Sequence, residues 1–190
     1  TEAKFSQVGF HWRTLLDLAP VIVDSVKQGL ISRFFVIGGC DGAKPGRNWF
    51  TDFAKAAPPD TIILTCGCGK FRIRNNDYGT ITLSNGVKVP RLLDMGQCND
   101  SFGAIQVALA LSKAFNCGVN DLPLTIALSW FEQKAVAVLL TLLALNVKGI
   151  MLGPTLPAFI TPAIYQALVA AYDLKPIGKD AVADMQAIMK

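Results

Sequence analysis

The sequence predicts an α/β fold: a Rossmann-like parallel sheet of about five or six strands, with helices on both faces and a small β-hairpin insertion. Short apolar runs alternate with amphipathic segments along the chain, as in successive βαβ units. Of the 190 residues, 52% are hydrophobic and only 17% are charged, which suits strands that are covered on both faces. We expect residues 1–190 to form a single domain.

The strands are predicted from apolar runs bounded by glycine, proline or polar residues. Between residues 80 and 90, the pair Asn85-Gly86 separates two alternating runs and predicts the hairpin. The predicted strands cover residues 33–38, 61–66, 91–96, 124–130, 147–152 and 174–178.

The helices are predicted from apolar residues at helical spacing and from start and stop signals. Prolines bound the segment 45–58, and Thr161-Pro162 supplies an N-cap followed by proline in the first turn. The predicted helices cover residues 14–29, 45–58, 98–115, 132–145 and 161–173, with a last short helix near the C-terminus.

Charge and hydropathy exclude several classes of partner. The formal net charge is +4, and the densest basic stretch, KFRIRNN at 70–76, lacks the clustering typical of a nucleic-acid surface. We find no signal peptide, and the longest apolar stretch, 135–147, is too short to span a bilayer. We therefore expect neither a nucleic-acid nor a membrane partner. The chain begins without Met, as a processed chain or a piece of a larger protein does.

The number of cysteines is odd, and at 190 residues the chain is well above the size of a miniprotein. Together these two facts argue against a secreted disulfide framework. We expect reduced thiols and a cytoplasmic location, with metal or redox chemistry in view. The five cysteines are Cys40, Cys66, Cys68, Cys98 and Cys117.

Several of these thiols follow predicted strands. Cys40 follows the first strand, Cys66 and Cys68 lie at the end of the second, and Cys98 follows the third. Because the carboxyl ends of parallel strands share one edge, where ligands bind, we expect these thiols to converge there. Thiolates suit zinc or iron–sulfur clusters, and single thiols on separate loops fit a large cluster better than a paired zinc knuckle.

Packing roles compete with ligation. Cys66 and Cys117 sit where a buried thiol commonly fills space, and His11 suits a surface or partly packed position. Glu132 and Lys134 follow the fourth strand, where they either join the thiols or form the solvated start of a helix.

The sequence gives less support to two other kinds of site, a nucleophilic cysteine and a phosphate-binding loop. Cys40 in its glycine-rich turn is placed like a nucleophile, but the only candidate base is His11. The stretch GGCDGAKPG, with Lys44, matches neither glycine-rich phosphate motif, and Asp41 would repel a phosphate.

Four long stretches then carry a resemblance: FFVIGGCDGAKPGRNWFTDFA, CGKFR, RLLDMGQCNDSFGAIQVALALS, and GVNDLPLTIALSWFEQKAVAVLLTLLALNVKGIMLGPTLPAF. They resemble the C-terminal domain of the hybrid-cluster (prismane) protein family, the hydroxylamine reductases, and more distantly the nickel–iron carbon monoxide dehydrogenases. The resemblance covers nearly the whole chain. It implies an oxidoreductase that reduces N–O substrates, such as hydroxylamine to ammonia, or nitric oxide, at a hybrid 4Fe–2S–2O cluster.

The resemblance also implies roles for individual residues. Cys40, in GGCDG, matches the ligand that the family carries as a persulfide, and Cys68 and Cys98 match two further cysteine ligands. Glu132 matches a carboxylate ligand to the cluster, and Lys134 matches the nearby lysine that can hydrogen-bond substrate or donate a proton. Cys66 and Cys117 match no ligand position.

The family's preceding domains supply a histidine, a glutamate and a cysteine ligand, and an N-terminal cysteine motif for a second cluster. None of these is found here, and His11 does not stand in a matching position. We therefore expect an incomplete cluster and no activity from the chain alone.

Expected partners are the remaining domains, an electron-donor protein and a small nitrogen-oxide substrate. We also expect an exposed apolar sheet edge that promotes self-association. The alternative is a catalytically silent packing domain with empty thiol sites or adventitious zinc.

Overall fold

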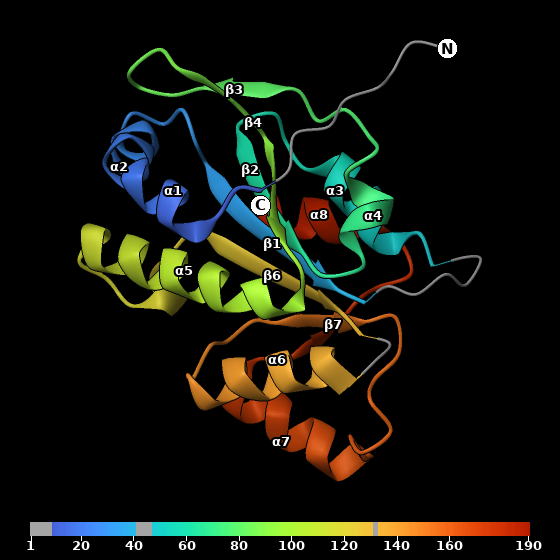
Figure 1. Cartoon of the computed structure of the whole chain (residues 1–190). Helices are drawn as coiled ribbons and strands as arrows, with labels where there is room; N and C mark the ends of the chain where they lie inside the picture. The colour runs from blue at the N-terminus through green and yellow to red at the C-terminus, as the bar shows by residue number, and fades with distance from the viewer. Residues whose placement is uncertain (1–8, 41–46, 131–132) are drawn as a thin grey trace, which may run out of the picture.

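Parallel strands build the centre of the molecule (Figure 1). The computed structural model describes residues 9–40, 47–130 and 133–190. Within them a six-stranded parallel sheet has the order β5-β2-β1-β6-β7-β8, which confirms the predicted fold class. The strands are β1 (Arg33–Gly39), β2 (Thr61–Cys66), β5 (Leu92–Gly96), β6 (Leu124–Ser129), β7 (Met151–Gly153) and β8 (Lys175–Pro176).

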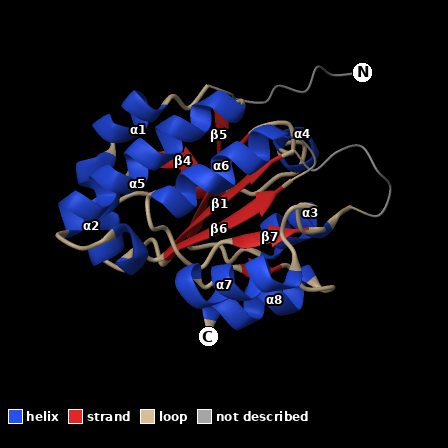
Figure 2. Ribbon diagram, turned by 90° about the horizontal axis from the view of Figure 1, so that it is seen from below, coloured by secondary structure: helices blue, strands red, loops and turns tan. Residues whose placement is uncertain are grey.

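Helices cover both faces of this sheet (Figure 2). One face packs against α3 (Trp49–Ala56), α4 (Lys70–Ile73) and α8 (Ala181–Met189). The other packs against α1 (Trp12–Asp17), α2 (Ala19–Lys27), α5 (Ser101–Phe115), α6 (Gln133–Ala144) and α7 (Pro162–Tyr172).

Alternation within β1 shows why both faces need cover. The side chains of Phe35 and Ile37 pack into the core beneath α3 and α8. The side chain of Phe34 points to the opposite face and packs into the core beneath α1, α2 and α5. All three side chains are at most 4% exposed. An apolar run without polar alternation is typical of a strand buried on both faces.

The predicted helix 14–29 is wrong as a single element. The structure has α1 and α2 instead, separated at Leu18, with Pro20 in the first turn of α2. Proline lacks a backbone N–H and clashes with the preceding turn, so it begins a helix more readily than it continues one.

The predicted strand 147–152 is also shorter than expected, because β7 begins only at Met151. Asn146 and Gly149 have φ values of 56° and 71°, which interrupt extended backbone. Residues 98–100 form a 3₁₀ turn ahead of α5. Residues 45–46, at the predicted start of the second helix, lie outside the described residues.

The hairpin is confirmed. Strands β3 (Thr80–Thr82) and β4 (Lys88–Pro90) pair antiparallel and form a separate two-stranded sheet. Its connection contains Gly86 at φ 82°, as an Asn-Gly turn requires. In the described part of the chain, no helix is long and apolar enough to cross a membrane.

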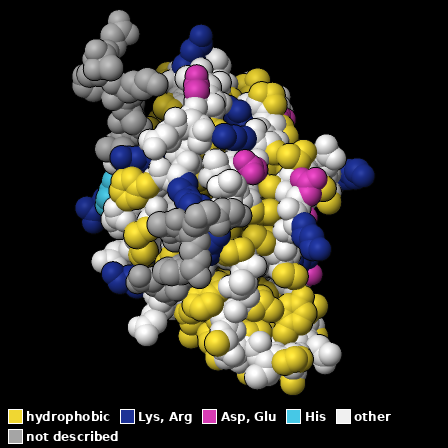
Figure 3. Space-filling model, turned by 90° about the vertical axis from the view of Figure 1, so that its right-hand side faces the viewer, with side chains coloured by type: hydrophobic (Ala, Val, Ile, Leu, Met, Phe, Trp, Pro, Cys, Tyr) yellow, Lys and Arg dark blue, Asp and Glu magenta, His cyan; other side chains and the backbone are white. Residues whose placement is uncertain are grey.

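Hydrophobic side chains remain exposed on one side of the molecule. They gather in its lower part, at the level of α6 and α7 (Figure 3). Leu140, Leu145 and Ile164 are 51%, 50% and 41% exposed, and no residue of α7 is buried.

Candidate functional site

The turns that carry three of the cysteines lie side by side at the carboxyl edge of the sheet. Cys40 follows β1, Cys68 follows β2 and Cys98 follows β5, and these strands are neighbours in the sheet. The Gly69 N–H donates to the Gly39 carbonyl at 2.9 Å, and the Gly67 N–H donates to the Gly96 carbonyl at 3.1 Å. The turn after β2 is therefore bonded to the turns on both sides of it.

Glycines permit this close approach. Gly39 has φ 112°, and a Cβ there would lie 1.8 Å from the Ser129 carbonyl oxygen. Gly67 has φ 82°, and a Cβ there would lie 2.7 Å from the Gly39 carbonyl oxygen. Both positions exclude any side chain, so the glycines around the thiols are fixed by backbone packing.

The three thiols differ in exposure, and two of them act on the ionisation of the third, Cys98. Cys40 is buried, Cys98 is partly buried and Cys68 is exposed. Burial raises the pKa of Cys98, and so do the charges of Cys68 and Cys40. The Cys68 backbone N–H and the Lys134 ammonium lower the same pKa. Cys40, Cys68 and Lys134 therefore all act on the ionisation of Cys98.

Of the predicted pair after β6, only one residue is described. Lys134 lies in the first turn of α6 and is exposed. Glu132 lies outside the described residues.

The other candidates have local partners. Cys66 is buried at the end of β2 with its Sγ 3.6 Å from the Ser101 Oγ, and burial raises its pKa. Cys117 is half-buried and packs against the core formed by α1, α2 and α5. His11 is exposed and caps α1, where its Nδ1 accepts from the Arg13 N–H at 3.3 Å.

The donor set does not have the spacing of a mononuclear site. Within residues 9–40, 47–130 and 133–190, no three Cys, His, Asp or Glu side chains are close enough to hold one metal ion. A multi-iron cluster takes its thiolates on different irons, so its ligands stand further apart than those of a single zinc. Thiols on separate neighbouring turns fit such a cluster.

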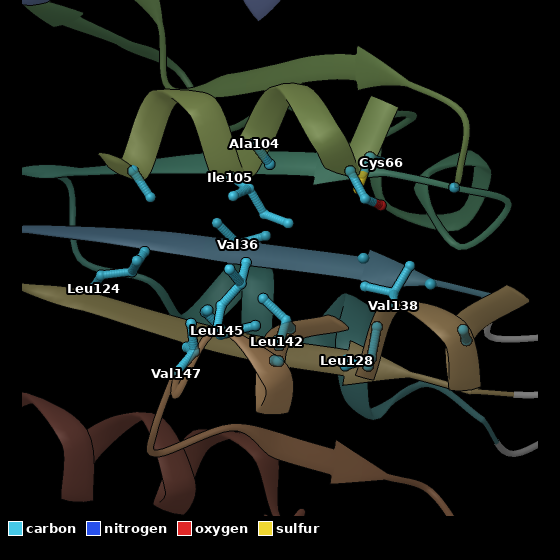
Figure 4. Close-up of a pocket in the computed structure, with 18 of the residues that line it drawn as sticks. Val36, Cys66, Ala104, Ile105, Leu124, Leu128, Val138, Leu142, Leu145 and Val147 are labelled. Atoms are coloured by element: carbon cyan, nitrogen blue, oxygen red, sulfur yellow. The ribbon is translucent and has the colours of Figure 1, made fainter. Parts of the chain in front are cut away.

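An apolar cavity of about 120 Å³ reaches the same edge. It lies between α5 and α6 over β1 and β6, and Val36, Ile105 and Leu142 point into it (Figure 4). Its lining extends to Cys66 and Cys98. Small uncharged molecules suit such a space.

Sequence reasoning missed a buried ion pair beside the thiols. The Lys70 Nζ lies 2.8 Å from the Asp94 Oδ1, and the two side chains are 7% and 3% exposed. Lys70 belongs to the basic stretch 70–76, which we considered only as a nucleic-acid surface. A signal was present in RLLDMG, because a carboxylate inside a buried strand requires a partner.

These features define a class: a parallel α/β domain that gathers thiols from several strands at its carboxyl edge. Residues 2–186 match the Prismane/CO dehydrogenase family, and the chain belongs to that family.

Similar proteins of known name are consistent with this family. A hydroxylamine reductase of Solidesulfovibrio magneticus is 59% identical over 89% of this chain and 30% of its own length. One from Zymomonas mobilis subsp. mobilis is 56% identical over 99% of this chain and 34% of its own length. The chain thus spans about a third of the length of the relatives it matches.

Solved structures of low identity share the fold. A carbon monoxide dehydrogenase from Thermococcus sp. AM4 superposes with a TM-score of 0.75 at 19% identity, over 95% of this chain and 32% of that one. A structure of acetyl-CoA synthase/carbon monoxide dehydrogenase, described with NiZn and NiNi Fe4S4 clusters, has a TM-score of 0.67 at 16% identity, over 94% and 30%.

Proposed function

We propose that this chain is the cluster-binding domain of a hydroxylamine reductase, with Cys40, Cys68, Cys98 and Glu132 as ligands to a hybrid 4Fe–2S–2O cluster. The observation that carries the proposal is the hydrogen bonding between thiol-bearing turns at one sheet edge. Family membership and the curated hydroxylamine reductases support the same activity.

The donor chemistry fits this cofactor. Three thiolates and a carboxylate combine soft and hard ligands, as a cluster with sulfido and oxo bridges needs. When held by these residues, the cluster would pass electrons from the donor protein to N–O substrates such as hydroxylamine or nitric oxide.

The chain's own residues would prepare the site for substrate. Glu132 would be the most labile of the proposed ligands, because a carboxylate is a harder ligand than a thiolate and binds iron less tightly in a cluster of this kind. Lys134 lies in the first turn of α6, two residues after the proposed ligand Glu132 in the sequence, and its ammonium would hydrogen-bond a substrate oxygen and donate a proton to it. The cavity next to Cys98 would admit the substrate.

The chain alone is proposed to form only part of the site. It spans about a third of its relatives, and the remaining ligands come from the rest of the protein. The whole enzyme is proposed to work in the cytoplasm with a protein electron donor.

The test uses a full-length protein that carries this domain. Glu132→Ala and Cys98→Ser are each expected to lower hydroxylamine reduction by about a hundredfold or more, because loss of a metal ligand costs at least as much as loss of the groups that orient one. Cys117→Ser, which removes a packed thiol at the far end of α5, should leave turnover unchanged. Unchanged turnover in the Glu132 and Cys98 variants would rule out their ligand roles.

A further inference from the structure

The buried ion pair between Lys70 and Asp94 joins two of the thiol-bearing turns. Lys70 begins α4, two residues after Cys68, and Asp94 lies in β5, four residues before Cys98. The Asp94 Oδ1 accepts from the Lys70 Nζ at 2.8 Å and from the Gly96 N–H at 3.0 Å. A single carboxylate oxygen thus binds the segment after Cys68 and the turn before Cys98.

The pair sits where the sheet is irregular. Thr65 pairs with Asp94 and the next residue, Cys66, pairs with Gly96, so one residue of β5 is left over. A bulge of this kind frees a strand end from the regular ladder and redirects the residues that follow. The orientation of the Cys98 turn therefore depends on local bonds more than on sheet pairing.

A buried ion pair of this kind is not explained by its contribution to folding stability alone. Removing two charges from water costs about as much as their attraction returns, and apolar replacements are often as stable. The Asp94 carboxylate has one further cation, since the Arg74 Nη1 lies 3.8 Å from its Oδ2. What the pair adds beyond burial is a fixed, directional connection between β5 and α4.

We infer that Lys70 and Asp94 are positioning residues that set the separation of the Cys68 and Cys98 thiols. The inference rests on the proposed function, because cluster binding is what requires a fixed thiol separation. Neither side chain acts as a ligand.

The separation is measured on the metal-free chain under anaerobic conditions. The probe is a bifunctional alkylating reagent that fluoresces only after bridging two thiols, and peptide mapping identifies the Cys68–Cys98 product. Lys70→Met is expected to slow this bridging by about tenfold or more, because an ångström-scale displacement costs orders of magnitude in proximity-dependent reactions. Lys70→Arg, which keeps a charged donor, should restore much of the rate.

Three controls isolate positioning from folding. The double variant Lys70→Met/Asp94→Asn removes both charges of the pair and retains an acceptor for the Gly96 N–H, and the Arg74 guanidinium, whose side chain is 29% exposed, stays in contact with water, so the variant should fold and still bridge slowly. Lys175→Met breaks a 2.9 Å ion pair whose side chains are exposed and should bridge at the wild-type rate. Single alkylation of exposed Cys68 should be equal in all variants.

The outcomes separate this inference from the proposed function. Wild-type bridging rates in Lys70→Met and in the double variant would overturn it, and so would a wild-type chain in which Cys68 and Cys98 do not bridge. A third outcome is slow bridging in the two variants together with no retained iron in any chain, the wild type included, after anaerobic reconstitution. That outcome would uphold the positioning role and count against cluster binding.

Discussion

Single glycines decide whether the thiol-bearing turns can meet. Gly67 and Gly86 have the same φ of 82°, but their surroundings differ. A Cβ at Gly67 would lie 2.7 Å from a backbone oxygen of the neighbouring turn, whereas a Cβ at Gly86 would meet nothing within 4 Å. The two positions therefore separate backbone strain from the close approach of the turns.

Gly67→Ala is expected to lower the free energy of unfolding by about 3 kcal/mol, because the new Cβ adds a backbone clash to the strain of a left-handed residue. Gly86→Ala should cost only about 1 kcal/mol, the strain alone. Urea unfolding of both variants measures the difference. Equal losses would show that the turns around Cys68 do not need to approach as closely as described.

At the scale of elements, Arg91 connects β2, the end of α3 and the segment before the hairpin through hydrogen bonds from its side chain. Its guanidinium donates to the Thr61 carbonyl at 3.0 Å, the Tyr78 carbonyl at 3.0 Å and the Ala57 carbonyl at 3.0 Å. It also donates to the Pro58 carbonyl. Burial lowers the pKa of Arg91, the charge of the Asp60 carboxylate raises it, and the bound carbonyls also compensate the charge of the guanidinium.

Arg91→Met should lower the free energy of unfolding by about 3 kcal/mol, because several buried carbonyls lose their donor at once. Arg33→Met removes one side-chain bond of 3.2 Å, to Thr125, and should cost about 1 kcal/mol or less. Denaturant unfolding of both variants provides the measurement. A cost at Arg91 no larger than at Arg33 would contradict this role.

Comparison of the elements shows which parts of the fold and of the candidate site the sequence predicts. Buried runs such as 33–38 and 61–66 identify strands β1 and β2 directly, and strand order then places Cys40, Cys68 and Cys98 at one edge. Helix α4 was missed because four residues give no helical period. The pairing of Lys70 with Asp94 was missed because it joins residues 24 positions apart, and no local pattern encodes that contact.

Over the whole molecule, the carboxyl edge combines thiols with exposed aromatic side chains. Phe71 lies three residues after Cys68 and is 46% exposed, and Phe102 lies four residues after Cys98 and is 59% exposed. These are the apolar groups expected at an edge that meets another part of a longer protein, and self-association through them stays a prediction. The central claim is that this edge carries one part of a cluster site.

Iron and acid-labile sulfide bound per chain, measured with the visible spectrum after anaerobic reconstitution, test that claim most directly. We expect iron below the full complement of the cluster in the wild-type chain, lost in the triple variant Cys40→Ser/Cys68→Ser/Cys98→Ser and retained in Cys117→Ser. A full complement of iron with strong charge-transfer bands would contradict the partial site. Iron content that is the same with and without the three thiols would contradict their role as ligands.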